Sequence, residues 1–272
     1  MGAGRPRIVT LLSDFGLSDG YVGAMKGVLL SQAPGITVVD LSHTIAPFDI
    51  SSAAYLLASA ALEFPPRTIH VAVVDPGVGS RRRLLLAEIA RHYFLVPDNG
   101  LLDVVLLRER LTRCVQVLPA RVAARRVAPT FHGRDLLAPA AAALARGMSL
   151  SRFGPPIRHL SRRLPLRPLV VHGNRCVGYV LHVDRFGTLI LNVEAAPLER
   201  FARGQPVRVQ VGHHRVTRWV RTYAEAPRGS LVALIGSQGW VEVAVVEGSA
   251  AQRLRAKVGQ RVELRREGAR GA

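Results

Sequence analysis

Asp75 is well placed for chemistry, because it stands at the end of an apolar run and beside a turn and several arginines. Val71–Val74 has the composition of a buried strand, the chain breaks at Pro76-Gly77, and Arg81–Arg83 follow. Open α/β sheets bind ligands at the carboxyl ends of their strands, so a carboxylate near guanidinium groups there indicates a site for a polar ligand. A surface ion pair without a function is the alternative, since such pairs are common.

Asp14 occupies a similar position, after an apolar run and before Gly16. A carboxylate at a strand end that faces a helix N-terminus suits hydrogen bonding to the two hydroxyls of a ribose. A helix-capping aspartate is the other interpretation. The chain has neither a GxGxxG nor a P-loop sequence, which argues against a Rossmann-type dinucleotide site.

His132 comes just before an alanine-rich helical segment, with Asp135 three residues later. Together with Asp75, these residues are compatible with a metal site, but the H-x-x-D spacing is a weak signal for one. Another interpretation is that His132 has only a structural role at the start of the helix. The simplest interpretation sets His132 beside Asp75 and Arg82, in a polar cluster that holds and polarises a water molecule.

These residues are positioned by alternating strand-like and helix-like segments in residues 1–151. Such alternation predicts an α/β domain with a mostly parallel sheet that is flanked by helices. The predicted strands are Ile8–Leu12, Ile36–Leu41, Ile69–Val74, Leu84–Ile89 and Tyr93–Val96, and the predicted helices are Tyr21–Ser31, Ser52–Glu63 and Arg134–Arg146.

The pattern changes after residue 151. Residues 152–175 contain four prolines among arginines and are typical of a linker. Residues 176–272 contain short β-rich runs between turns, which predict a C-terminal antiparallel β-barrel or sandwich. These predicted strands are Val177–Val183, Thr188–Val193, Val207–Val211, Leu231–Ile235, Trp240–Val246 and Arg261–Leu264.

Composition excludes several classes of protein. No apolar run is long enough to span a membrane, and the apolar run near the N-terminus is interrupted by Asp14, as expected for a first strand rather than a signal peptide. Cys114 and Cys176 are far apart and predict buried reduced thiols in a cytoplasmic protein. The formal net charge is +18, but only Lys26 and Lys257 are lysines. The scattered arginines, with few aromatic residues between them, argue for genomic base composition and against nucleic-acid binding.

Seven segments, in the same order, resemble one family. It is the S-adenosyl-L-methionine (SAM) hydroxide adenosyltransferases, or SAM hydrolases, which are related to the SAM-dependent fluorinase and chlorinase. The segments are residues 12–27, 38–50, 73–83, 96–102, 130–135, 183–192 and 235–250.

The resemblance implies a homotrimer without a cofactor or a metal, in which each SAM lies between the N-terminal domain of one subunit and the C-terminal domain of its neighbour. It also implies an Asp–Arg–His triad, which falls on Asp75, Arg82 and His132 and which the halogenases lack. The expected reaction is in-line attack of an activated water or hydroxide on ribose C5′, with adenosine and methionine as products. Either Asp75 or His132 is then the base.

The substrate contacts are also implied by the resemblance. Asp14 corresponds to the ribose carboxylate, and Phe48 and Phe131 to apolar walls. The residues expected to contact the methionine part of SAM are Asp19, Tyr21, Asp184 and Ser237, and those expected to contact adenine are Phe186, Thr188 and Asn192. The sequence departs from the family pattern at Thr188 and Val246, where asparagine is usual, and at Leu191. These departures bear on adenine binding more than on the chemistry.

Three alternatives remain open from the sequence. They are a SAM-dependent halogenase that forms 5′-halo-5′-deoxyadenosine, a metal-dependent hydrolase, and a non-catalytic protein that binds nucleosides or nucleic acid. The triad argues against the first of these.

Overall fold

A computed structural model describes residues 8–123, 126–161, 164 and 170–267. The chain divides into two compact units, Met1–Leu164 and Pro165–Ala272. Residues up to 164 therefore belong with the first unit, although residues 152–164 fall within the linker predicted from the sequence. No helix among the described residues is long and apolar enough to cross a membrane.

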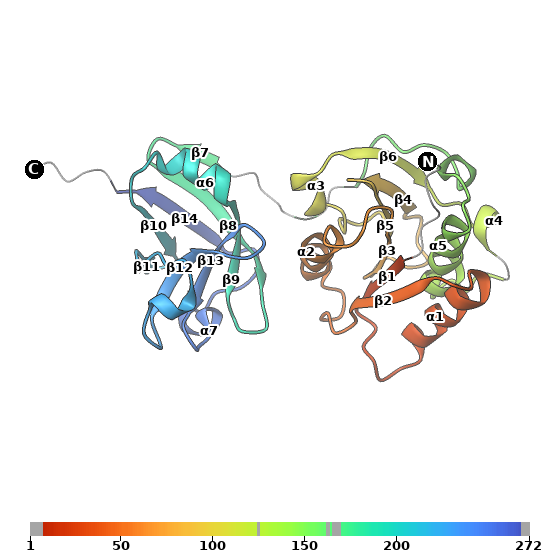
Figure 1. The fold of residues 1–272 in the computed structure, drawn as a ribbon, viewed down its shortest axis with the longest axis horizontal. Coiled ribbons are helices and arrows are strands. Elements are labelled where there is room, and N and C mark those ends of the chain that lie inside the picture. The colour runs from red at the N-terminus through yellow and green to blue at the C-terminus, as the bar shows by residue number, and fades with distance from the viewer. Residues whose placement is uncertain (1–7, 124–125, 162–163, 165–169, 268–272) are drawn as a thin grey trace, which may run out of the picture. The chain divides into compact units, whose positions relative to one another are not determined.

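The first unit contains a six-stranded sheet in the order β2-β1-β3-β5-β4-β6 (Figure 1). The strands β1 (Ile8–Ser13), β2 (Thr37–Ser42), β3 (Ile69–Val73) and β5 (His92–Pro97) pair in parallel, and β4 (Leu84–Ile89) lies antiparallel between β5 and β6 (Leu111–Gln116). The predicted α/β class with a mostly parallel sheet is thus confirmed.

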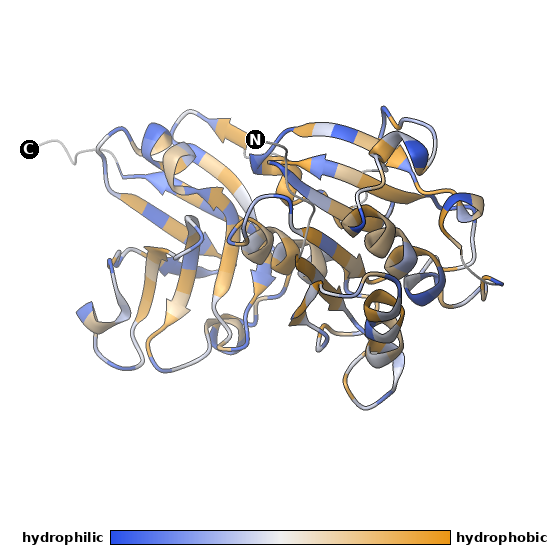
Figure 2. Ribbon diagram, turned by 45° about the vertical axis from the view of Figure 1, so that its right-hand side comes forward, coloured by the Kyte–Doolittle hydropathy of each residue, from blue (hydrophilic) through white to orange (hydrophobic). Residues whose placement is uncertain are grey.

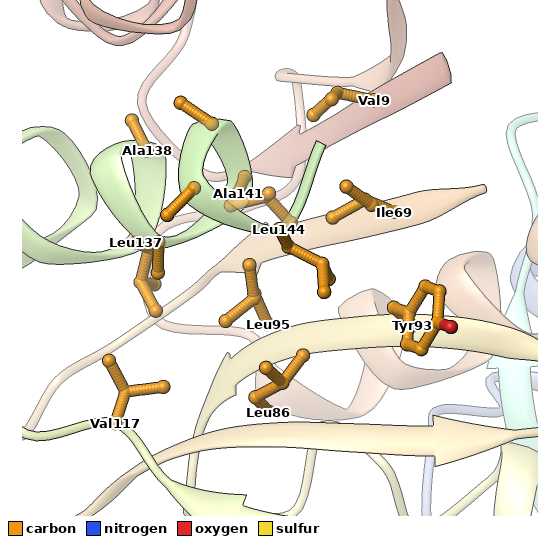
Figure 3. Packing of buried hydrophobic residues seen from close by; sticks show 14 of the residues in the cluster. Val9, Ile69, Leu86, Tyr93, Leu95, Val117, Leu137, Ala138, Ala141 and Leu144 are labelled. Carbon is orange, nitrogen blue, oxygen red and sulfur yellow. The ribbon is translucent and has the colours of Figure 1, made fainter. Parts of the chain in front are cut away.

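Helices cover both faces of this sheet. The helices are α1 (Tyr21–Gln32), α2 (Ile50–Ala61), α3 (Val105–Arg108), α4 (Pro119–Val122) and α5 (Ala138–Ala145). Successive strand side chains point to opposite faces, so β3 places Val71 in the core under α1 and α5 and Ala72 in the core under α2. Figure 3 shows Leu144 of α5 packed over Ile69 and Leu95. Such burial on both faces is typical of parallel sheets.

The predicted helix Arg134–Arg146 begins instead with a π-helical turn, η1 (Gly133–Leu137), which continues into α5. Pro139 stands near the start of α5. Proline has no amide hydrogen and its ring clashes with the carbonyl four residues earlier, so an α-helical turn cannot form there without distortion. The wider turn at residues 133–137 accommodates this proline, and it directly follows His132.

The second unit is an antiparallel, barrel-like sheet in the order β11-β10-β14-β8-β9-β13-β12, with β7 paired to β8. Its strands alternate apolar and polar residues (Figure 2), as expected where one face packs on a core. Trp219 pairs with Ala233 of β12 and donates its indole N–H to the carbonyl of Val207 on β10 (2.6 Å), which links the two ends of the sheet. The strands are β7 (Val170–His172), β8 (Arg175–Val183), β9 (Leu189–Glu194), β10 (Val207–Val211), β11 (His214–Val216), β12 (Leu231–Ile235), β13 (Trp240–Val245) and β14 (Arg261–Arg266), and the helices are α6 (Ala195–Ala202) and α7 (Ala250–Leu254).

A buried histidine pair in the first sheet predicts acid sensitivity of the fold. His70 of β3 is bonded to Thr10 Oγ1 (2.8 Å) and to His92 Nδ1 (3.2 Å). Burial, and then the proximity of His92, lower the pKa of His70 from 6.5 to about 3. The His70 ring therefore binds a proton more tightly in the unfolded chain than in the folded protein. The free energy of unfolding should fall as the pH falls from 6.5 to about 3.

We expect urea titrations across this pH range to show a flatter pH dependence of the unfolding free energy for His70→Gln than for the wild type. Each unit of pKa difference between the folded and unfolded states corresponds to about 1.4 kcal/mol. Equal pH dependence in the two proteins would contradict a contribution from His70.

Candidate functional site

The structure brings Asp75, Arg82 and His132 together in one hydrogen-bonded cluster. Arg82 Nε lies 2.6 Å from each oxygen of the Asp75 carboxylate, and Arg82 Nη2 forms an ion pair with Oδ2. Arg82 Nη2 also lies 3.1 Å from His132 Nδ1. The Asp75 and Arg82 side chains are each only 6% exposed. Arg82 is therefore the central member that links the other two, from separate segments of the chain.

Close packing of two loops holds this cluster. Asp75 and Arg82 lie at either end of the loop between β3 and β4, and His132 lies directly before η1. Gly79 has a φ of +80°, and a Cβ there would lie 3.0 Å from the carbonyl oxygen of Pro129. Only glycine combines this backbone conformation with so close an approach. The β3–β4 loop is thus seated against the segment that leads into His132.

The hydrogen bonds of the cluster fix the proton on His132. A guanidinium only donates hydrogen bonds, so Nδ1 of His132 accepts from Arg82 and the neutral ring carries its proton on Nε2. Burial, and then the charge of Arg82, lower the pKa of His132 below its usual value, while Asp75 and Asp135 act in the opposite direction. At neutral pH the ring is uncharged and presents an Nε2–H donor.

A cavity of about 280 Å³ opens beside this cluster. Its polar lining includes Asp14, Asp75 and His132, and its aromatic lining includes Tyr21, Phe48 and Phe131. The ring centroids of Tyr21 and Phe131 are 5.4 Å apart, in an edge-to-face arrangement. This combination of aromatic walls and separated polar groups suits a ligand with both flat apolar and polar parts.

Asp14 holds an unusual backbone conformation at Phe48. The backbone N–H of Phe48 donates to Asp14 Oδ2 (2.8 Å), and Phe48 has a φ of 69° with 68% of its surface exposed. Left-handed conformations of residues other than glycine are strained by roughly 1–3 kcal/mol and cluster at ligand sites. Gly20 occupies the N-cap of α1, so the capping interpretation of Asp14 does not apply to that helix. Asp19 lies exposed in the turn before α1 and lines neither of the two cavities described here.

His43 supports the segment around Asp14, a role that no pattern in the sequence indicated. His43 Nδ1 lies 2.7 Å from Ser13 Oγ, and the His43 carbonyl accepts from the N–H of Gly16 (2.8 Å). Both bonds flank Asp14. Ser13 and His43 are 30 residues apart, so neither periodicity nor spacing indicates this contact.

The second unit has its own cavity, of about 1100 Å³, which includes four of the predicted residues: Asp184, Phe186, Thr188 and Ser237. Asp184 Oδ1 accepts from the backbone N–H groups of Phe186 (2.9 Å) and Thr188 (2.8 Å). Asp184 therefore shapes the turn that leaves Phe186 80% exposed.

Asn192, which the resemblance assigns to adenine, forms a hydrogen bond to the neighbouring strand. Its Oδ1 accepts from the backbone N–H of Tyr179 on β8 (2.7 Å), and the residue lines neither of the two cavities. The neighbouring β9 residue Leu191 is fully buried in the core of the unit.

Tyr223 and Glu242 also line the cavity of the second unit and were missed from the sequence. The Tyr223 hydroxyl donates to Glu242 Oε2 (3.1 Å). Burial raises the pKa of Glu242, and burial together with Glu242 raises the pKa of Tyr223 to about 12. The one available signal was an acidic residue within the otherwise apolar run Trp240–Val246.

No group of three or more His, Cys, Asp and Glu side chains among the described residues is arranged to hold a metal ion. The Asp135 carboxylate accepts from the N–H of Ala128 (2.9 Å) and pairs with Arg134 (2.8 Å). Both contacts are to residues outside the Asp75–Arg82–His132 cluster.

Comparisons with known proteins find relatives over nearly the whole chain. Models of the SAM hydroxide adenosyltransferase N-terminal and C-terminal domains match residues 9–154 and 178–263. An (R)-S-adenosyl-L-methionine hydrolase of Thermus thermophilus is 42% identical and covers 95% of this chain and 99% of that protein. One of Salinispora arenicola is 36% identical (94% and 97% covered), and a fluorinase of Nocardia brasiliensis is 26% identical (96% and 98%).

The fold is also found in solved structures. A crystal structure of an uncharacterized conserved protein from Thermotoga maritima has a TM-score of 0.87, with 32% identity, and covers 95% of this chain and 100% of that one. A conserved hypothetical protein from Thermus thermophilus has a TM-score of 0.78, with 41% identity and coverage of 96% and 99%.

Proposed function

The chain belongs to the SAM hydroxide adenosyltransferase family, and we propose that it hydrolyses S-adenosyl-L-methionine to adenosine and L-methionine. The observation that carries this proposal is the Asp75–Arg82–His132 cluster on the wall of an aromatic-lined cavity. The hydrolase relatives are also more similar to the chain, at up to 42% identity, than the fluorinase relatives at 26%.

The substrate occupies the first-unit cavity of one subunit and the second-unit cavity of a neighbouring subunit. The ribose hydroxyls bind Asp14, whose Oδ2 also holds Phe48, and C5′ faces the triad. Phe48 and Phe131 form apolar walls. Tyr21 and Asp19 contact the methionine part in the first unit.

In the second unit, Asp184 and Ser237 contact methionine, and Phe186 and Thr188 contact adenine. Asn192 contributes to adenine binding through the backbone of β8, which it holds.

The difficult part of the reaction is activation of the nucleophile. When the C5′–S bond breaks, the sulfonium sulfur becomes the neutral thioether of methionine, so the leaving group needs no proton. Neutral water, in contrast, attacks saturated carbon poorly. His132 Nε2–H and the Arg82 guanidinium donate to the water oxygen and favour hydroxide in line with the C5′–S bond. Because Nε2 already carries a proton, Asp75 is the proton acceptor. The C5′–O bond forms as the C5′–S bond breaks, and the released proton passes through Asp75 to solvent.

No metal or cofactor takes part in this scheme. The buried thiols Cys114 and Cys176 suit a reducing compartment, and we place the enzyme in the cytoplasm.

Product analysis tests the proposed reaction. Purified protein is incubated with SAM, with and without chloride, fluoride and a chelator, and the products are identified by mass spectrometry. Adenosine and methionine should form at equal rates in every mixture. A 5′-halo-5′-deoxyadenosine product would instead support the halogenase alternative, and loss of turnover with chelator would support the metal-dependent one.

Asp14→Ala should raise KM for SAM by about tenfold to a hundredfold, because it removes charge-assisted hydrogen bonds and releases Phe48. The effect on kcat should be smaller. Steady-state kinetics measure both. Asp49→Ala is the matched control, since the Asp49 carboxylate caps α2 through Ser52 and the residue does not line the cavity. An unchanged KM in Asp14→Ala would contradict the ribose role.

We further propose a homotrimer in which each active site combines the first-unit cavity of one subunit with the second-unit cavity of its neighbour. Asp75→Asn and Phe186→Asp subunits carrying different tags would be co-expressed and purified through both tags. Each mixed trimer then contains one site with both halves intact, so about a third of wild-type activity should return. Sites confined to single subunits, or a monomer by light scattering, would contradict this arrangement.

A further inference from the structure

We infer that the turn Pro97–Gly100 is a positioning device for the triad, in which Asn99 and Asp98 hold the two ends of the loop that carries Asp75 and Arg82. This inference rests on the proposed function for its catalytic meaning, but its structural content can be tested separately. No role for these two residues follows from the reaction itself.

Asn99 holds the start of the loop. Its Nδ2 donates to the carbonyl oxygen of Val74 (2.8 Å), and the residue is 5% exposed. The Val74 carbonyl and the Asp75 amide belong to one planar peptide unit. Fixing this carbonyl therefore fixes the plane from which the Asp75 side chain extends.

Asp98 holds the end of the loop. Its backbone N–H donates to the carbonyl of Arg83 (3.0 Å), and its Oδ2 accepts from Arg83 Nε (2.8 Å). Its Oδ1 accepts from the N–H of Ser161 (2.8 Å), so both carboxylate oxygens are engaged. These bonds hold both the backbone and the side chain of Arg83, which is next to Arg82 in the chain.

Besides the packing of Gly79 against Pro129 and a bond from the Arg82 N–H to Ser80 Oγ (3.3 Å), few hydrogen bonds hold the interior of the loop. Between Asp75 and Arg82 it contains Gly77 and Gly79, and its internal backbone hydrogen bonds are Val78 to Asp75 and Ser80 to Gly77. Arg82 must nevertheless reach Asp75 and His132 at once. Since a displacement of about 1 Å can reduce turnover by about a hundredfold, anchors at both ends of such a loop matter for catalysis.

The Asn99 side chain offers a variant that tests positioning. Its Oδ1 is buried and accepts no hydrogen bond from any residue that the structure describes. Asn99→Leu removes this unpaired oxygen but also leaves the buried Val74 carbonyl without its Asn99 donor, so the variant should lose some stability. The melting temperature measures that loss, and kcat is compared at a temperature where the variant is folded.

The test uses Asn99→Leu and, as a second variant, Arg83→Gln, each in the full chain. Arg113→Gln is the matched control, because Arg113 pairs with Glu88 of β4 without contacting the loop. We measure kcat and KM for SAM, the melting temperature, and the pKa of the His132 ring by NMR of histidine-labelled protein. The charges that act on that ring are Arg82, Asp75 and Asp135.

Both variants should lose at least about tenfold in kcat with KM changed less than about twofold. The pKa of His132 should rise toward its usual value as Arg82 moves away, and the control should match the wild type. Unchanged kcat and an unchanged His132 pKa in both folded variants would overturn the inference. If the wild type does not turn over SAM, the proposed function fails, and the His132 titration alone still decides between positioning and no positioning.

Discussion

Asp75→Asn should lower kcat for SAM hydrolysis by on the order of a hundredfold or more while leaving KM largely unchanged. The variant keeps the size of the side chain but removes the proton acceptor and its charge. The amide also presents an N–H₂ group toward Arg82, which only donates. Steady-state kinetics and a direct SAM-binding titration measure the two effects.

Glu88→Gln is the matched control for this variant. Glu88 pairs with Arg113 (2.7 Å) in the same sheet, and the Arg113 side chain is 63% exposed. The Glu88→Gln variant therefore removes an ordinary carboxylate–arginine pair at the surface. It should keep wild-type turnover. Near-normal kcat in Asp75→Asn would contradict the proposed role of the triad.

Arg82→Lys should have an effect of similar size, on the order of a hundredfold in kcat, although it preserves the positive charge. A lysine ammonium cannot span the Asp75 carboxylate and His132 Nδ1 with the planar fork that Arg82 provides. Loss of the bond to Nδ1 frees that nitrogen, and His132 no longer has a fixed proton on Nε2.

The pH dependence of Arg82→Gln, which removes the positive charge, gives a second measurement. The charge of Arg82 is one of the causes that lower the pKa of His132, so loss of that charge should raise the pKa. Activity requires neutral His132 and is lost as the pH falls through this value. The acid limb of the kcat profile should therefore lie at higher pH in Arg82→Gln than in the wild type. Identical profiles would show that Arg82 does not act on His132.

The strand-end position of Asp75 and the apolar run before it indicated the candidate site from the sequence. The apolar run of β3, which is buried along its whole length, and the repeated strand–helix alternation also predicted the parallel sheet. The central place of Arg82 did not follow from spacing, because it depends on the path of a loop that contains two glycines.

Other features depend on tertiary contacts that local patterns do not encode. The edge strand β6 has exposed Thr112 and Arg113 in its first half, and this mixed pattern did not indicate a strand. The contact between Asp14 and Phe48 joins residues 34 positions apart. Asn192 has the residue type expected of a ligand contact, yet its oxygen is used by β8.

The most direct test of the account is hydrolysis of SAM in oxygen-18 water, with mass spectrometry of both products. Attack of water on C5′ predicts adenosine that carries one labelled oxygen at its 5′ position, and methionine without label. Adenosine without the label, or no turnover by a protein that still binds SAM, would contradict the central claim.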